Sequence, residues 1–463
     1  MAQQVAPAPA GWRRLVWLGP GFLWMVSAAG SGELLFTPRV GSLYGYALVW
    51  ALLLAVVLKW FVNREIGRYA VCTGRNLLAG FARLPGPRAW AVWFIVVPQI
   101  LVAVSTLAGL AGAAATALIL GLPGPVQWWA IASIATTTAL VVWGRYRAVE
   151  AVATTMALAL GIAAVIAAVA AGPSLGPLTA GLLPRVPEQT DAAEILPWLG
   201  FMLSGAAGMI WYSYWLPAKG YGAAGKSPAA GDIERLRGWI RQMTLDTSIA
   251  VVGTLLITMA FLILGVELLR PRGLVPEEER VAEVLGRLLG DLWGPVGFWF
   301  MVVAVFIGFW DTVLSDQDGF SRMFASGARL LRRPTARTTP TRGTSGPAAA
   351  ASPAVASPAG GPDAAGTADV DAADRRIRRW IVLLGLAVAP TALYLVVGQP
   401  VTLLKAAGAI EAAHIPVVAG LTLYLNHRDL PRRLRPGPVA ITGTSIAGLF
   451  FVAFTAFYLW TIW

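Results

Sequence analysis

Long runs of apolar residues, separated by short polar or Pro/Gly-rich stretches, make up most of the chain. Eleven runs are long enough to cross a membrane as a helix, which takes about 20 residues for roughly 30 Å of hydrocarbon. They lack the alternation of apolar and polar residues that marks barrel strands, so we predict an all-α polytopic membrane protein. The predicted spans are residues 15–42, 43–62, 90–120, 126–143, 149–171, 195–217, 243–266, 293–316, 380–398, 401–425 and 438–461.

The composition agrees with this pattern. Hydrophobic residues make up 57% of the 463 residues and charged residues only 13%, whereas a soluble protein carries about 25% charged residues. The single cysteine, Cys72, excludes an internal disulfide, and two histidines with one cysteine are too few for a zinc cluster. The sequence has no Gly-rich loop followed by Lys-Ser/Thr. We therefore predict neither an enzyme nor an ATP-driven pump, and we expect no cofactor.

The basic residues lie mostly on one side of the predicted membrane. If the N-terminus is cytoplasmic, 28 of the 36 Lys and Arg residues lie in inner segments and five in outer segments. The positive-inside rule then places the N-terminus inside and the C-terminus outside the cytoplasmic membrane. The net charge of +12 is thereby explained by orientation, so we expect no nucleic-acid partner. The lipid bilayer would surround what we expect to be a monomer.

The predicted spans form two halves of five helices and one extra helix. Residues 334–373 are rich in Thr, Pro, Ala, Gly and Ser and have no aromatic residue, so we predict a disordered cytoplasmic linker. The predicted segments are a cytoplasmic tail (1–14), transmembrane repeat one (15–171), an extracellular loop (172–194), transmembrane repeat two (195–425, interrupted by the linker), a cytoplasmic loop (426–437) and helix eleven (438–463).

Two predicted spans contain residues that weaken a helix. The first includes Gly-Ser-Gly-Glu at 30–33, and the sixth includes Ser-Gly-Ala-Ala-Gly-Met at 204–209. Unwound backbone persists at membrane depth only where it is buried in protein or lines a wet cavity. Paired interruptions five spans apart indicate an inverted-repeat transporter with a site at the midplane. The alternative is that the glycines only let helices pack closely.

Three motifs support a family assignment: Gly-Pro-Gly-Phe-Leu at 19–23, Gly-Tyr-Ala-Leu-Val-Trp at 45–50 and Thr-Gly-Arg-Asn-Leu at 73–77. They resemble the opening of the Nramp transporters, which import divalent metals such as manganese and iron, usually with protons. The resemblance implies the inverted 5+5 helix fold of the amino acid–polyamine–cation superfamily, commonly with an eleventh helix and with helices 1 and 6 broken.

The chain departs from the two metal-binding signatures of that family. Asp-Pro-Gly-Asn aligns with residues 30–33, so the usual Asp is absent and Glu33 stands in place of the Asn. Met-Pro-His aligns with residues 209–211, so Met209 remains while Pro and His are lost. The resemblance implies that Glu33, the Met209 sulfur and the carbonyls of Gly30 and Ala206 contact the metal, with Ser31 in the same pocket.

Glu33 and Met209 also have structural interpretations. Glu33 could cap the outer half of the first helix and pair with Arg39, and Met209 could be a packing residue. A carboxylate near the bilayer centre is nevertheless a functional hypothesis by default. A thioether favours transition metals, whereas oxygen ligands alone favour Mg²⁺. The sequence leaves Mn²⁺, Fe²⁺ and Mg²⁺ open.

Polar residues in two later spans are further candidates. Asp311, Ser315 and Asp318 share one face of the eighth span. They indicate either a second cation or proton site or a solvated inner vestibule. In the tenth span Glu411 and His414 share a buried face and can hydrogen-bond, which suits a proton relay. The acids of the usual Nramp proton route are missing from the third span, so this pair is the replacement that the sequence offers.

We predict a secondary transporter that moves a divalent metal cation by alternating access. The aromatic group Trp211, Tyr212 and Tyr214 supports an alternative in which the same fold carries a small organic cation or a neutral solute. These rings could equally belong to the core. A membrane scaffold that transports nothing is the third interpretation.

Overall fold

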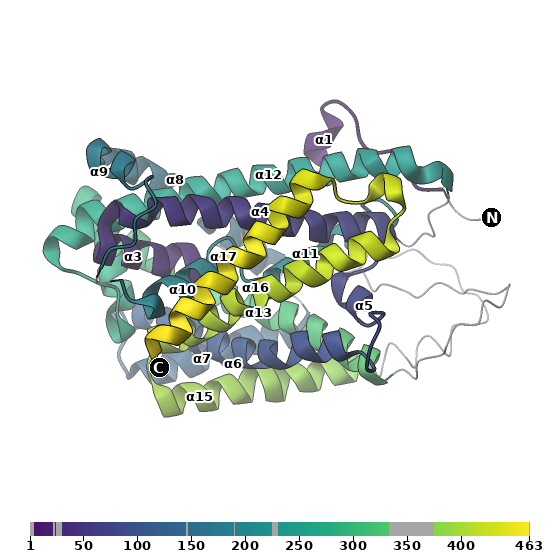
Figure 1. Cartoon of the computed structure of the whole chain (residues 1–463). Coiled ribbons are helices and arrows are strands. Elements are labelled where there is room, and N and C mark those ends of the chain that lie inside the picture. The colour runs from purple at the N-terminus through teal and green to yellow at the C-terminus, as the bar shows by residue number, and fades with distance from the viewer. Residues whose placement is uncertain are drawn as a thin grey trace.

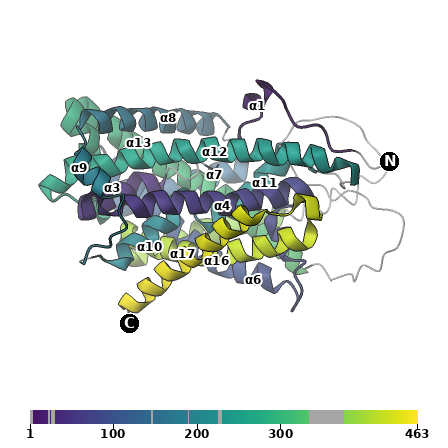
Figure 2. The ribbon, with the colours of Figure 1, turned by 45° about the horizontal axis from the view of Figure 1, so that its top comes forward.

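Helices account for nearly all secondary structure in this computed structural model, which describes residues 4–21, 24, 30–144, 147–188, 190–224, 230–332 and 375–462. Within those ranges the chain forms no β-strand. The predicted linker 334–373 and residues 25–29 of the first span lie outside the described residues. Long helices run roughly parallel through the molecule, and α4 and α12 lie side by side in both views (Figures 1 and 2).

The chain forms these principal elements in order: α1 Arg13–Val16, η1 Ser31–Phe36, α3 Thr37–Tyr44, α4 Val49–Thr73, α5 Leu77–Phe81, α6 Trp90–Leu118, α7 Val126–Trp143, α8 Arg147–Ala170, α9 Leu175–Ala180, α10 Ala192–Phe201, α11 Ala206–Ala218, α12 Ile233–Leu264, η4 Gly265–Leu269, α13 Val281–Arg332, η7 Ile381–Val388, α15 Ala389–Val397, α16 Pro400–Asp429 and α17 Pro438–Ile462.

Ten helices of the described chain are long and apolar enough to cross a membrane. The first, Ser31–Thr73, has 43 residues, which a straight helix would stretch to about 65 Å, twice the hydrocarbon thickness. Gly45 interrupts it with a φ of 60°. This helix therefore contains the end of the predicted first span and the whole of the predicted second one.

A second interruption lies in α13. Gly294 has φ 65° and ψ −154° and is followed by Pro295, so the 52-residue helix consists of two helices that meet at a kink. The longer part, after Pro295, contains almost all of the predicted span 293–316. The part before Gly294 starts with buried residues such as Val281 and Leu285, although the sequence pattern placed no span there.

The ends of the helices agree with the alternation of inner and outer segments. Figure 1 shows α5 at one end of the bundle, whereas α9 and the C-terminal end of α17 lie at the other. The segment around α5 was predicted to be inner, and the segment around α9 was predicted to be outer. Which end faces the cytoplasm stays a prediction from the basic residues.

The discontinuous helix α10–α11 lies at the centre of the bundle. Its most apolar stretch is 94% buried, against 22–61% in the other nine spans. Peripheral helices instead expose large apolar side chains, such as Val396 on α15 (84% exposed) and Trp460 on α17 (77%). An exposed apolar surface of this kind suits lipid rather than water.

Glycines allow α10 to approach α16 closely. A Cβ atom added at Gly408 of α16 would lie 2.8 Å from the carbonyl oxygen of Pro197, and one added at Gly200 would collide with the carbonyl of Gly408. Backbone therefore meets backbone at this crossing. The close packing of small residues is the usual way in which helices associate in membranes.

We expect Gly408→Ala to lower the thermal unfolding midpoint of the purified protein, because overpacking at a backbone contact costs about 1–3 kcal/mol. The matched control is Gly420→Ala in the same helix, where an added Cβ meets nothing within 4 Å. That variant should be as stable as the parent or slightly more stable. Equal midpoints for the two variants would show that the crossing tolerates the extra atom.

Candidate functional site

The sixth predicted span is broken between α10 and α11. Helix α10 ends at Phe201 and α11 begins at Ala206. Between them Leu203 (φ 55°) and Ser204 (φ 73°) adopt the left-handed conformation, which costs about 1–3 kcal/mol for a residue other than glycine. The break lies at 202–205, not over the whole of 204–209 as predicted, because Met209 is already inside α11, where its N–H bonds the Gly205 carbonyl.

A lysine from α4 binds the carbonyl groups that this break exposes. The Lys59 ammonium donates to the carbonyl oxygens of Gly200 (2.8 Å), Met202 (2.5 Å) and Ser204 (2.9 Å). We call these three oxygens the carbonyl cage. Lys59 is fully buried, and its three N–H donors match the three acceptors of the cage.

Two carboxylates bind backbone N–H groups, one within the break and one in the first turn of α11. Glu33 of η1 accepts from the Leu203 N–H at 2.8 Å, and Glu411 of α16 accepts from the Ala207 N–H at 3.2 Å. A Cβ atom at Gly205 would lie 2.6 Å from the Glu411 carboxyl carbon. The glycine therefore lets that carboxylate reach the backbone.

Three charged side chains from three helices thus hold the break. Unpaired backbone groups cost several kcal/mol each in a membrane, and a lone buried charge is also costly. Here the charged side chains form hydrogen bonds with the open backbone groups. The same bonds replace the water that the buried charges have lost, so both costs are reduced. Lys59 also lies within Coulombic range of Glu33 and Glu411.

Sequence reasoning did not single out Lys59 as a candidate site residue. A signal was present, because Lys59 lies near the middle of the 25-residue helix α4. An ionisable residue at that depth marks a functional site by default. What the sequence could not show was the partner, which is backbone 141 to 145 residues away.

The first span meets the sixth at this break. Helix η1 begins at Ser31, preceded by Gly30 with a non-helical ψ of −105°. A Cβ at Gly32 would lie 2.9 Å from the Met202 nitrogen, so only glycine permits this approach. The predicted meeting of the two interrupted helices is therefore present in the fold, and Ser31 and Glu33 are buried there.

The Glu33 carboxylate has one oxygen available. Oε1 accepts from Leu203, whereas the buried Oε2 has no hydrogen-bond partner among the described residues. The alternative in which Glu33 pairs with Arg39 is not what the structure shows. Arg39 instead forms a two-bond ion pair with Glu194 of α10, at 2.8 Å for each bond, and Lys405 joins the same carboxylate.

The other two predicted ligands, Met209 and Ala206, follow the break directly in the sequence. Met209 is fully buried in the first turn of α11. Ala206 is the first residue of α11, so its carbonyl belongs to a helical turn, whereas the carbonyls of the break itself face Lys59. On α4, one turn beyond Lys59, the buried amide of Asn63 has no hydrogen-bond partner for either atom in the described structure.

Glu411 and His414 are joined through a third residue. The Gln99 amide of α6 donates to Glu411 (3.3 Å) and lies 3.2 Å from Nδ1 of His414. Nε2 of His414 is 3.2 Å from the Phe94 carbonyl. We infer that His414 carries its proton on Nε2, because an amide N–H donates to Nδ1. The predicted pair is therefore a chain of three polar side chains.

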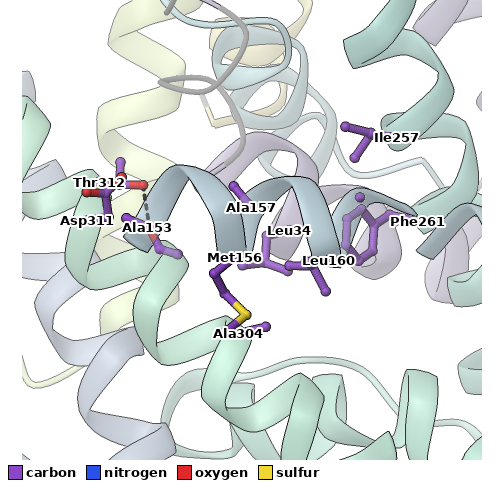
Figure 3. A pocket seen from close by; sticks show the side chains of 12 residues that line it. Leu34, Ala153, Met156, Ala157, Leu160, Ile257, Phe261, Ala304, Asp311 and Thr312 are labelled. Atoms are coloured by element: carbon purple, nitrogen blue, oxygen red, sulfur yellow. Dashed lines mark hydrogen bonds between the residues drawn. The ribbon is translucent and has the colours of Figure 1, made fainter. Parts of the chain in front are cut away.

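The predicted acidic face of the eighth span is divided between two environments. Asp311 and Thr312 of α13 line a cavity of about 40 Å³ with residues of η1, α8 and α12, among them Leu34, Met156 and Phe261 (Figure 3). Thr312 also adjoins Gly30, since a Cβ there would lie 2.9 Å from its methyl group.

Further along α13, Ser315 donates to the Thr312 carbonyl. Asp318 is paired with Arg322 at 2.7 Å and with Arg378. These ion pairs agree with the alternative of an inner vestibule for Asp318. The structure does not bring Asp318 and Asp311 into one site.

The aromatic residues of α11 face different neighbours. The Tyr212 hydroxyl bonds Thr247 of α12 at 2.7 Å. The Trp211 ring packs edge-on against Phe320 of α13, with the centroids 4.9 Å apart. Tyr214 is partly buried against the core. Contacts of this kind are those of packed core rings rather than of one shared cage.

The site offers few conventional metal ligands. Within the described ranges no group of three or more His, Cys, Asp or Glu residues could hold a metal ion. A cation bound at the break would therefore depend on one carboxylate oxygen, neutral oxygens and the Met209 sulfur. Such a ligand set suits an ion that binds and leaves rather than a permanently held one.

Comparison with known proteins identifies the class of protein. The solved structure of a manganese transporter from Eremococcus coleocola shares the fold, with a TM-score of 0.67 and 15% identity over 98% of this chain and 89% of that one. The two proteins therefore share one fold. The family profile "Natural resistance-associated macrophage protein-like" (Nramp) matches residues 21–309. The chain belongs to the Nramp family, which confirms the resemblance noted in the sequence.

Relatives in sequence are distant. An uncharacterized protein of Pasteurella multocida is 25% identical over 326 residues, which cover 68% of this chain and 71% of that protein. The divalent metal cation transporter MntH of Aeromonas hydrophila is 31% identical over 138 residues, or 29% of this chain and 32% of that transporter. The chain thus matches about a third of the length of MntH.

Proposed function

We propose that this protein carries a divalent metal cation of the Mn²⁺, Fe²⁺ or Mg²⁺ class across the cytoplasmic membrane, with η1 and the α10–α11 break forming the site. The observation that carries the proposal is Oε2 of the buried Glu33, which has no hydrogen-bond partner among the described residues. A buried carboxylate oxygen without a partner is rare and is a ligand suited to a cation. Membership of the Nramp family supports the same cargo.

Met209 and the polar groups around the break would complete the ligand set. A thioether in the first turn of α11 favours Mn²⁺ or Fe²⁺ over Mg²⁺. The Gly30 carbonyl accepts from the Leu34 N–H at 3.1 Å, so only its second lone pair would serve as the oxygen ligand that the family resemblance implies. Retained or bound water would supply the rest, because the described structure offers no second free carboxylate at this point.

Alternating access would move the inner part of the first span. That part is attached to its neighbours by polar contacts. Asp246 of α12 accepts from the backbone N–H groups of Gly19 (2.9 Å) and Gly21 (2.6 Å), and Tyr221 donates to the Trp17 carbonyl at 2.5 Å. Water can replace these hydrogen bonds when the segment moves toward the cytoplasm, whereas the contacts of the Trp17 ring with Tyr221 and Trp239 would have to separate.

We expect Glu33→Gln to reduce Mn²⁺ uptake into proteoliposomes by about ten- to a hundredfold, because it removes a charged ligand worth roughly 1.5–3 kcal/mol. The glutamine oxygen can still accept from Leu203, so the fold should persist. Glu283→Gln, in a surface ion pair with Arg280, is the control and should retain uptake. Unchanged Mn²⁺ uptake by a folded Glu33→Gln variant would refute the site.

Met209→Leu should change the preference among metals. Leucine keeps the volume but lacks the sulfur, so uptake of Mn²⁺ and Fe²⁺ should fall several-fold while uptake of Mg²⁺ stays the same. The control is Met301→Leu, another fully buried methionine, in α13. If the Mn²⁺ to Mg²⁺ ratio is the same in both variants, Met209 is a packing residue.

The chain Glu411–Gln99–His414 is our candidate for the proton route. Glu411→Gln should remove the effect of an imposed pH gradient on Mn²⁺ uptake, because the glutamine cannot ionise. Uptake driven by the metal gradient alone should remain measurable. The measurement is the initial rate of Mn²⁺ uptake with and without a pH gradient. An undiminished pH response of the variant would exclude Glu411 as the coupling group.

A further inference from the structure

Lys59 is buried in an unusual way. A buried lysine is normally paired with a carboxylate, yet every donor of the Lys59 ammonium goes to a neutral carbonyl oxygen of the cage. Glu33 and Glu411 lie within Coulombic range of it but bond to backbone N–H groups instead. The ammonium is therefore coordinated as a metal ion would be, by a set of backbone oxygens.

The surroundings of the cage favour a cation of any kind. Two cage members, Gly200 and Met202, lie at the C-terminal end of α10, where the helix dipole attracts positive charge. The Phe451 ring of α17 lies 5.5 Å from the Lys59 nitrogen, within the range of cation–π attraction. Rings of carbonyl oxygens bind alkali ions in proteins by replacing their hydration shell.

We propose that the carbonyl cage is a monovalent-cation site that the protein fills with its own ammonium group, that of Lys59. An ion from solution is then excluded from the cage, and the cargo is restricted to the other side of the break, at Glu33 Oε2. The assignment of the cage rests on the contacts of Lys59 alone, and only the placement of the cargo at Glu33 rests on the proposed function.

The first test measures thermal unfolding midpoints of the purified full chain in detergent. In N-methylglucamine chloride, Lys59→Met should unfold at a lower temperature than the parent. KCl, NaCl or NH₄Cl at equal ionic strength should raise its midpoint by about 1–2 °C once the ion exceeds its Kd roughly tenfold. The parent and Lys405→Met, which loses a lysine bonded to Glu194, should not respond to the small cation.

Two results would overturn the proposal. One is a folded Lys59→Met variant whose midpoint is the same in all four salts. The other is an equal response to small cations in the parent and in Lys405→Met, since the effect would then arise elsewhere. Because the readout is stability and not uptake, failure here is distinguishable from failure of the transport proposal.

A second variant tests the site by chemical rescue. Lys59→Ala removes three methylene groups and the ammonium, which together correspond to propylammonium. Propylammonium should raise the midpoint of this variant, whereas 1-propanol, which has the same stem without the charge, should not. An equal effect of the amine and the alcohol would mean that the pocket recognises the stem and not the cation.

If neither variant folds, the parent protein still allows a test. The chain has four lysines, Lys59, Lys219, Lys226 and Lys405, so ¹⁵N-lysine labelling gives a simple spectrum that can be assigned by replacing the other three with Arg. Lys59 should give an ammonium signal that exchanges slowly with water. A neutral amine signal, or rapid exchange like that of Lys219, would contradict a cation held in the cage.

Discussion

The structure depends on the exchange of hydrogen bonds between a broken helix and three charged side chains. At the centre of a membrane neither an open backbone nor a bare charge is stable alone. Here Lys59 binds the carbonyls of Gly200, Met202 and Ser204, while Glu33 and Glu411 bind N–H groups. Because these side chains come from η1, α4 and α16, the break also holds four parts of the bundle together.

This arrangement explains where a cargo could bind. Lys59 occupies the carbonyls of Gly200, Met202 and Ser204, which are not the Gly30 and Ala206 carbonyls that the family resemblance implied as ligands. One carboxylate oxygen of Glu33 has no hydrogen-bond partner among the described residues. A site with one charged oxygen would bind a divalent cation less tightly than a cluster of carboxylates. Weaker binding suits a transporter, because a transporter must release its cargo. In place of the family's Asp this chain has the carboxylate of Glu33, and it holds the Lys59 ammonium at the same break.

The glycines have a role that sequence reasoning identified only in part. It read the clusters at 30–33 and 204–209 either as unwound backbone or as close packing, and the structure shows both. Gly32 and Gly205 admit the backbone of Met202 and the carboxylate of Glu411, so the close approach is what makes the break possible. Gly208, in contrast, lies within a regular helix.

The sequence alone determined the membrane class, nearly all spans and the family, because length, hydropathy and local motifs are properties of consecutive residues. It also placed Glu33 and Met209 beside the break. It could not assign Lys59 to its carbonyl cage, Arg39 to Glu194, or Gln99 to the place between Glu411 and His414. Those contacts join residues more than 100 positions apart, and only the packing of the helices decides which of several buried polar groups meet.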